Sequence, residues 1–256
     1  MLLLSTSSLT GYGLHKIFLL AEKAGYDGID LTVDFALHDT YNAEYIDSLI
    51  QITNIPIVSV SAPQKHLTKK QLEITMNLAN ELEVRMVNVH PPHRLEKEKD
   101  WFGSYLKTLQ NKYHNMNVNI INAPPKTWLF FIAEYGDARP ETIKKMTEHT
   151  ALSIENIDTS SGVGLMKTLV LLGSTLDFVY LSDNEEETGK TGLFPGEGTM
   201  PLESLLIKLG EKEHPFQGVF SLQVKPEFLG AGNDEKVVKR LQEAQKYLYK
   251  YFKPKV

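Results

Sequence analysis

The stretch Ala21-Glu22-Lys23-Ala24-Gly25-Tyr26-Asp27-Gly28-Ile29-Asp30-Leu31 joins the end of a predicted helix to the start of a predicted strand. Apolar residues with helical spacing run up to Ala24, and Gly25 suits the left-handed conformation that ends many helices. The apolar run that follows is continuous rather than alternating and meets a polar residue at Thr32. Such a run is typical of a parallel strand that is covered on both faces.

The same unit recurs along the whole chain. Strands are predicted over residues 2–4, 28–31, 55–60, 86–89, 118–121, 151–157, 178–181 and 219–222. Helices are predicted between and after them, over residues 14–24, 42–52, 67–82, 101–113, 140–149, 164–172, 201–209 and 234–252. Eight alternations of strand and helix predict an α/β protein with a single (β/α)8 TIM barrel domain over residues 1–256.

The length and composition of the chain are consistent with a single soluble α/β barrel domain. The chain has 256 residues, 42% of them hydrophobic and 23% charged, which suits one barrel with a large core. A net charge of -5 argues against a nucleic-acid partner, and the lack of cysteine excludes disulfides, thiolate zinc sites and a cysteine nucleophile. The start reads as a first strand rather than a signal peptide, and no apolar stretch reaches the roughly 20 residues that span a bilayer. We expect a cytoplasmic protein without a membrane partner.

Polar residues follow nearly every predicted strand. In a parallel barrel the carboxyl ends of the strands converge on one site, so these residues are the candidates for chemistry. We expect Asp158 and His90 to be catalytic. The expected substrate-binding residues are Asn122, Tyr180, Asp183, Gln223 and Lys225.

Several candidates have two interpretations. His90 is either a substrate contact or a structural hydrogen-bonding residue. Asp183 either accepts a hydrogen bond from a sugar hydroxyl or caps the loop at residues 185–187. Lys225 is either a Schiff-base or phosphate-binding lysine or, as we favour, a charged partner of Glu227 or Asp158.

Four loop features also have two interpretations. The backbone N–H groups of Pro195-Gly196-Glu197-Gly198 either cradle a substrate or belong to an ordinary turn. Asp30 and Asp34 are an acid pair or solvated turn residues, and His93 with Arg94 binds an anion or lies in a solvated loop. The aromatic insert from Thr127 to Tyr135, expected as a helix or loop, is either outside packing or a lid over the site.

Several strand ends resemble those of one known superfamily. The opening stretch is similar to the first helix and second strand of the xylose-isomerase-like barrels, which include sugar isomerases, epimerases, relatives of inosose dehydratase and endonuclease IV. The further matching motifs are Val87-Asn88-Val89-His90-Pro91, Asn122-Ala123-Pro124-Pro125, Ile157-Asp158-Thr159-Ser160, Leu181-Ser182-Asp183-Asn184 and Phe194-Pro195-Gly196-Glu197-Gly198. Each motif is weak alone, but their order covers nearly the whole chain.

The resemblance implies a divalent metal held by glutamate, aspartate, histidine and glutamate at strands 5 to 8, with the glutamates moving a proton between neighbouring carbons. These positions fall on Ile121, Asp158, Tyr180 and Gln223, so only Asp158 matches. We therefore expect no cofactor, or a weakly bound Mn, Mg or Zn ion with Asp158 as its one surviving ligand.

Two other sources of chemistry fit less well. Glu155 is expected inside the sixth strand, where alternation places it on the face opposite Asp158. An endonuclease IV site would use His90 but needs further histidines, and Ser161 stands where one of them would be. No histidine occurs between His149 and His214.

Three functions remain, in decreasing order of preference. The first is a divergent isomerase or epimerase of a small sugar or sugar phosphate. The second is a catalytically silent barrel that binds a carbohydrate or a partner protein after losing its metal site. The third is endonuclease IV-like DNA repair. The expected partner is a small-molecule carbohydrate.

Overall fold

The computed structural model describes residues 1–64, 67–93, 102–124, 127–128, 132–135, 139–157, 164–211 and 215–254, with the backbone alone at 127–128 and 132–133. Eight parallel strands form a closed barrel in the order β1-β12-β9-β8-β5-β4-β3-β2. Their bounds are β1(Leu2–Ser5), β2(Gly28–Thr32), β3(Ile57–Ser61), β4(Met86–Val89), β5(Asn117–Ile121), β8(Thr150–Ser153), β9(Leu176–Leu181) and β12(Val219–Leu222). The predicted TIM barrel is confirmed.

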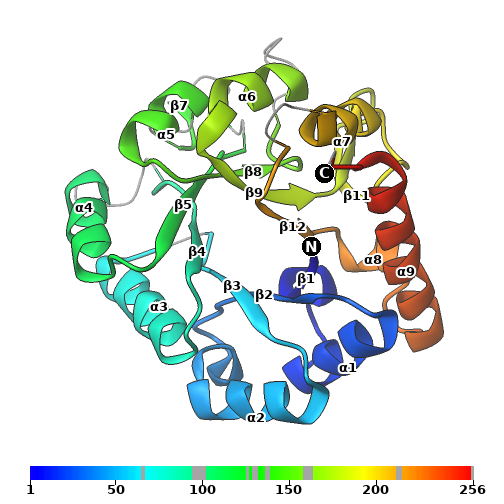
Figure 1. Ribbon diagram of the computed structural model, residues 1–256, viewed down its shortest axis with the longest axis horizontal. Helices are drawn as coiled ribbons and strands as arrows, with labels where there is room; N and C mark the ends of the chain where they lie inside the picture. Colours follow the sequence, from blue (N-terminus) through cyan, green and yellow to red (C-terminus); the bar gives the residue numbers. More distant parts are fainter. Residues whose placement is uncertain are drawn as a thin grey trace.

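Helices surround the barrel on its outside (Figure 1). Their bounds are α1(Leu14–Ala24), α2(Ala43–Thr53), α3(Lys69–Glu81), α4(Phe102–Lys112), α5(Pro140–Met146), α6(Leu165–Leu172), α7(Leu202–Glu211), α8(Pro226–Leu229) and α9(Asp234–Tyr251), with 3-10 turns η1(Thr6–Leu9), η2(His38–Tyr41) and η4(Gly173–Thr175). Gly25 ends α1 with a φ of 75°, as the opening stretch predicts. Among the described helices, none is long and apolar enough to cross a membrane.

Two short antiparallel pairs extend beyond the barrel. The hairpin β10(Asp183–Glu185) and β11(Lys190–Leu193) follows β9, and the pair β6(Thr127–Trp128) and β7(Ile132–Ala133) follows β5. The second pair is the predicted aromatic insert, so the expected helix or loop was wrong for its described part. A backbone bridge joins Tyr135 to His93 in the loop after β4.

The sixth strand of the barrel is shorter than its sequence suggests. The apolar run over residues 151–157 predicts one strand, but β8 ends at Ser153 and residues 154–157 form turns, with hydrogen bonds from Asn156 N to Ser153 O and from Ile157 N to Ile154 O. Asn156 favours such a turn because its side chain competes with regular strand pairing. This early ending moves Glu155 out of the strand.

The apolar core has two separate parts. The larger lies between the outer faces of the strands and the helices. The smaller lies inside the barrel and consists of Leu3, Ile121, Ala151, Phe178 and Tyr180, with Val58, Met86 and Val219 packed against it. The interior cluster closes part of the barrel, and polar residues occupy other inward positions.

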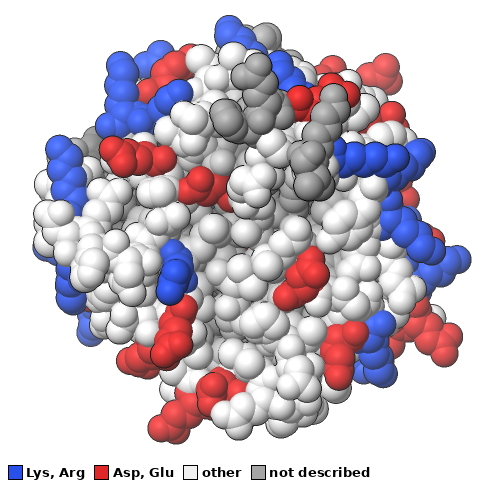
Figure 2. Space-filling view, viewed as in Figure 1, with Lys and Arg blue, Asp and Glu red and all other residues white. Residues whose placement is uncertain are grey.

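Charged side chains are distributed around the rim of the molecule. Figure 2 shows blue and red residues interspersed at the periphery, with mostly uncharged residues over the middle of the barrel. This distribution is what a net charge of -5 spread along the chain leads us to expect.

Candidate active site at the carboxyl end of the barrel

The candidate residues follow the carboxyl ends of neighbouring parallel strands. His90 follows β4, Asn122 follows β5, Asp183 follows β9, and Gln223 follows β12. Because all eight barrel strands are parallel, these residues lie at the same end of the barrel. Asp158, the first of the predicted catalytic residues, lies outside the described residues, as do Arg94 and Ser161.

A buried carboxylate surrounded by serines lies inside the barrel. Asp30 on β2 is fully buried, and its Oδ1 accepts hydrogen bonds from Ser59 Oγ at 2.7 Å and Ser61 Oγ at 2.8 Å. Its Oδ2 accepts from Ser221 Oγ at 3.4 Å. Burial raises the pKa of Asp30, although the serine hydroxyls, including that of Ser5, oppose the rise.

Both predicted interpretations of Asp30 were therefore wrong. Asp30 is neither a solvated turn residue nor a partner of Asp34, which is exposed and accepts a hydrogen bond from Ala36 N. The sequence carries a signal for this arrangement. Ser59 and Ser61 alternate along β3 with apolar residues, and small polar residues at inward positions indicate a polar barrel interior.

Tyr180 is connected to the buried carboxylate of Asp30 through the hydroxyl of Ser61. Its ring contacts Phe178, and its hydroxyl lies 2.7 Å from Ser61 Oγ. Since Ser61 donates to Asp30, the tyrosine donates to Ser61. Burial raises the pKa of Tyr180 well above its ordinary value, and the charge of Asp30 adds to this rise.

Asp183 anchors the glycine loop that follows the hairpin. Its Oδ2 accepts from the backbone N–H groups of Gly196 at 2.9 Å and Gly198 at 3.0 Å. Its Oδ1 accepts from Met200 N at 3.2 Å and Asn184 N at 2.9 Å. Burial raises the pKa of Asp183, although these four N–H groups oppose the rise. With both oxygens engaged by backbone N–H groups, Asp183 has a structural role, and its role in substrate binding stays a prediction.

The glycine loop itself is directed toward this carboxylate. The predicted cradle of N–H groups from Gly196 and Gly198 holds Asp183 rather than facing the site. A Cβ at position 198 would lie 2.4 Å from Asn184 O, so the close approach requires glycine. Arg240 on α9 covers the same loop, with a hydrogen bond to Glu197 and its guanidinium 3.5 Å from the Phe194 ring centroid.

Asn122 joins the ends of two neighbouring strands. Its Nδ2 donates to Ser153 O at 3.0 Å, and its Oδ1 accepts from Ser153 N at 2.6 Å. Its own carbonyl accepts from Asn156 Nδ2 at 2.8 Å. The side chain is buried and positions the turn after β8, so its predicted role in substrate binding is untested while its structural role is clear.

His90 is a neutral imidazole at the inner side of the site. Burial lowers its pKa to about 4, so it carries no charge at neutral pH. Its Nδ1 is buried and has no hydrogen-bond partner in the described part of the chain. A neutral imidazole with a free nitrogen can accept or donate a hydrogen bond to a ligand.

Four further buried polar atoms also have no hydrogen-bond partner among the described residues. The unpartnered atoms of the described residues are Thr32 Oγ1, Asn88 Nδ2, Asn119 Oδ1 and Ser182 Oγ, in addition to His90 Nδ1. Asn119 donates to Asn88 Oδ1, and Asn88 faces the Tyr180 hydroxyl, which places both amides inside the barrel. Strand alternation puts His90 and Ser182 on the same inner side as Asn88 and Tyr180.

Glu155, Thr191 and Lys225 form a second polar group at this end. Thr191 Oγ1 on β11 donates to Glu155 Oε1 at 3.2 Å and accepts from Lys225 Nζ at 3.5 Å. All three side chains are half-buried. The sequence pattern missed Glu155 because it lengthened β8, although the polar pair Glu155-Asn156 interrupts the apolar run and marks the turn.

The described residues do not fit the divalent metal that the resemblance implies. Ile121 packs in the interior apolar cluster, the Tyr180 hydroxyl is engaged by Ser61, and Gln223 Nε2 donates to Ser7 Oγ at 3.3 Å. No group of three or more His, Cys, Asp or Glu side chains gathers among the residues described. A weakly bound ion at Asp158 stays a prediction.

His93, in the loop after β4, contacts a carboxylate of the chain itself. Its Nε2 lies 2.9 Å from Glu134 Oε1.

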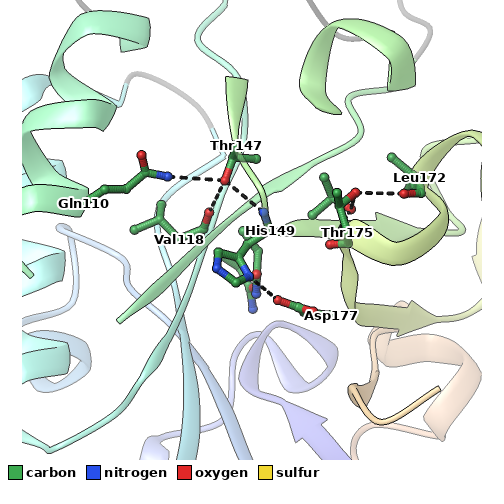
Figure 3. Close-up of polar contacts among 10 residues, drawn as sticks. Gln110, Val118, Thr147, His149, Leu172, Thr175 and Asp177 are labelled. Atoms are coloured by element: carbon green, nitrogen blue, oxygen red, sulfur yellow. Dashed lines mark hydrogen bonds and ion pairs between the residues drawn. The ribbon is translucent and has the colours of Figure 1, made fainter. Parts of the chain in front are cut away.

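A second polar cluster lies at the amino ends of β8 and β9. There, His149 Nδ1 lies 2.5 Å from Asp177 Oδ2, and Thr147 Oγ1 accepts a hydrogen bond from Gln110 and donates one to Val118 O (Figure 3). The second cluster fastens the end of the barrel that lies away from the candidate site.

The fold has known counterparts among proteins of low sequence identity. No model of a known protein family matches the sequence. An uncharacterised protein of Mycobacterium leprae (strain TN) is 23% identical, with 96% of each chain covered. A xylose isomerase domain protein from Alicyclobacillus acidocaldarius superimposes with a TM-score of 0.72 at 15% identity, with 98% of each chain covered. A D-tagatose 3-epimerase-like protein gives 0.67 at 18% identity, with 98% of this chain and 97% of the other covered. The chain therefore has the fold of the xylose isomerase-like TIM barrels.

Proposed function

We propose that the protein is a divergent sugar isomerase or epimerase that binds a small carbohydrate at the carboxyl end of its barrel. The observation that carries this proposal is a set of five buried polar atoms that have no hydrogen-bond partner among the described residues. All of them lie at inward positions on β2, β4 and β5 or directly after β4 and β9. Buried polar groups normally have hydrogen-bond partners, so several such atoms around one site favour a polar ligand.

A carbohydrate supplies the matching chemistry. Each sugar hydroxyl both donates and accepts, which suits a set that contains the amide N–H of Asn88, the amide oxygen of Asn119 and the hydroxyl of Ser182. The similarity in fold to a D-tagatose 3-epimerase-like protein supports the same class of ligand. A silent carbohydrate-binding barrel is the second candidate, favoured by the residues Ile121, Tyr180 and Gln223 at the metal positions.

Ser182→Ala provides a direct test of ligand binding. In the free protein the substitution removes a buried hydroxyl without a described partner, so the unfolding free energy should stay equal or rise. The affinity for a bound sugar should fall about tenfold, since a hydrogen bond worth about 1.4 kcal/mol is lost. The ligand is found by thermal protection in a panel of aldoses, ketoses and their phosphates, and its Kd is measured by calorimetry.

Thr150→Val is the matched control at the far end of the barrel. Thr150 Oγ1 donates to Thr175 O at 3.0 Å, so this variant should lose stability and keep its affinity for the sugar. Loss of stability without loss of affinity in Ser182→Ala would contradict the proposal. So would the failure of every sugar in the panel to protect the protein.

A further inference from the structure

The ionisable side chains at the described strand ends differ in their burial, their charge and the number of their hydrogen-bond partners. Asp183 has both carboxylate oxygens engaged by backbone N–H groups, and Asp30 lies fully buried among serines. His90 is neutral. Glu155 and Lys225 are half-buried, and neither forms a direct ion pair with another described residue.

The fold holds Glu155 and Lys225 close together without joining them directly. Both flank Gly192, where an added Cβ would lie 3.1 Å from Lys225 Cγ and 3.3 Å from Glu155 Oε1. Thr191 Oγ1 bridges them, as a donor to the carboxylate and an acceptor from the ammonium group. Within the part of the chain that the structure describes, the bridge leaves Glu155 Oε2 and the remaining N–H groups of Lys225 available to a ligand.

Three elements fix this arrangement. Asn184 Nδ2 donates to Ile154 O at 2.9 Å and Glu155 O at 3.3 Å, which ties the turn after β8 to the hairpin. Asn184 Oδ1 accepts from Gly192 N at 3.2 Å. Lys225 N donates to Gly192 O at 2.9 Å, which ties the loop after β12 to the same hairpin. A carboxylate and an ammonium group are thus positioned on a rigid frame at the carboxyl end of the barrel.

We propose that Glu155 is the proton-transfer base and Lys225 the electrophile of a metal-independent aldose–ketose isomerisation. This inference rests on the proposed function, because it assigns chemistry to the carbohydrate site described above. Carboxylates serve as general bases and lysines stabilise developing oxyanions when both lie within hydrogen-bonding reach of the substrate.

The steps balance with these two groups alone. The Glu155 carboxylate takes the proton from C2 of the aldose, the C–H electron pair forms the C1=C2 bond, and O1 takes a proton from the Lys225 ammonium group. The enediol then loses the O2 proton to the Lys225 amine while C1 takes the proton from Glu155. Both side chains return to their starting states, and the product is the 2-ketose.

Among the described residues, the group beside Gly192 contains one carboxylate, and this determines which reaction is expected. A proton moved between C2 and C1 on the same face of the enediol needs one base, which Glu155 provides. Epimerisation at one carbon needs a second proton donor on the opposite face of the enediol, and the group formed by Glu155, Thr191 and Lys225 holds no second carboxylate. Isomerisation is therefore the expected activity rather than epimerisation.

Glu155→Gln tests the assignment with a built-in control. The variant keeps the shape and an oxygen for Thr191, so its melting temperature and its Kd for the bound sugar should stay close to those of the wild type. Its rate of interconversion should fall at least a hundredfold. Glu185→Gln is the matched control, since Glu185 lies in the same hairpin, and its Oε2 also accepts from a threonine, Thr188.

Lys225→Met and the exposed Lys190→Met form the second pair. The first should lower kcat by a similar factor, and the second should not. The substrates are the pentoses, hexoses and phosphates that protect the protein, and products are identified by chromatography against aldose, ketose and epimer standards.

The outcomes separate this inference from the proposed function. A sugar that binds but is not interconverted by the wild type overturns the assignment of Glu155 and leaves sugar binding intact. Turnover that survives Glu155→Gln, or an epimer as the product, also overturns it. If no sugar binds, both this inference and the proposed function fail.

Discussion

Asp30 illustrates how burial within the barrel determines the state of one residue. Its carboxylate has only hydroxyl partners among the described residues, and burial raises its pKa. A carboxyl group with a raised pKa in the folded protein binds its proton more tightly there than in the unfolded chain. Its contribution to stability is complete below the unfolded pKa of about 3.9 and is lost as the pH rises through the folded pKa.

Asp30→Asn should remove the part of the pH dependence of stability that comes from this carboxyl group. The unfolding free energy of the wild type should fall relative to that of the variant as the pH rises above about 4, by up to about 1.4 kcal/mol for each pH unit within the window. Urea denaturation over a pH series measures the difference, with the exposed Asp39→Asn as control. A difference between wild type and Asp30→Asn that is constant over pH would show that the carboxyl group is not perturbed.

The sequence predicted where the strand-end residues lie but not which partners they have. The strand-end pattern placed His90, Asn122, Asp183 and Gln223 together at the carboxyl end of the barrel, where the structure has them. It could not show that Asp183 is occupied by the backbone of residues 196–200, because these contacts depend on how a later loop folds back. It placed Glu155 in a strand because apolar residues continue on both sides of the turn.

The β10–β11 hairpin and the glycine loop that follows it form one side of the candidate site. The hairpin carries Thr191 and Gly192, and the loop is held by Asp183. The sequence indicated a loop with two glycines but not its direction. That direction depends on the close approach of Gly198 to Asn184 O.

Gly198→Ala should loosen this element. The added Cβ would lie 2.4 Å from Asn184 O and 2.5 Å from Asp183 Oδ1, so the loop must shift and weaken its hydrogen bonds. The expected loss is about 1–3 kcal/mol, which lowers the melting temperature by about 2–4 °C for each kcal/mol in a chain of this size.

Gly103→Ala gives the control for Gly198→Ala. Gly103 lies in α4, where an added Cβ meets nothing within 4 Å, so alanine there should raise the melting temperature slightly through its higher helix propensity. Equal melting temperatures for Gly198→Ala and the wild type would show that the loop is not held as described.

The barrel was predictable from the sequence because each of its parallel strands corresponds to a continuous run of apolar residues. Each described barrel strand overlaps its predicted range, with ends that differ by up to four residues at β8, from 157 to Ser153. The division of the interior into an apolar cluster and a serine-lined carboxylate was not predictable. It depends on register between strands that are distant in sequence, such as Ser221 on β12 beside Asp30 on β2.

The donor set predicts how the molecule responds to metal ions. With Ile121, Tyr180 and Gln223 at three of the four metal positions, added Mn²⁺ should raise the melting temperature by less than about 1 °C. A tightly bound ion would instead stabilise the folded protein by mass action and shift the midpoint by several degrees. Differential scanning calorimetry with Mn²⁺ and with a chelator distinguishes the two results.

Amide hydrogen exchange with and without the most protective sugar shows where on the barrel the carbohydrate binds. The sugar should slow exchange in the segments that end at the site, around residues 88–90, 154–157, 182–193 and 223–225. It should leave the amino-end loops at 147–149 and 173–175 unchanged. Protection confined to the amino-end loops or to the outer helices would contradict carbohydrate binding at the carboxyl end of the barrel.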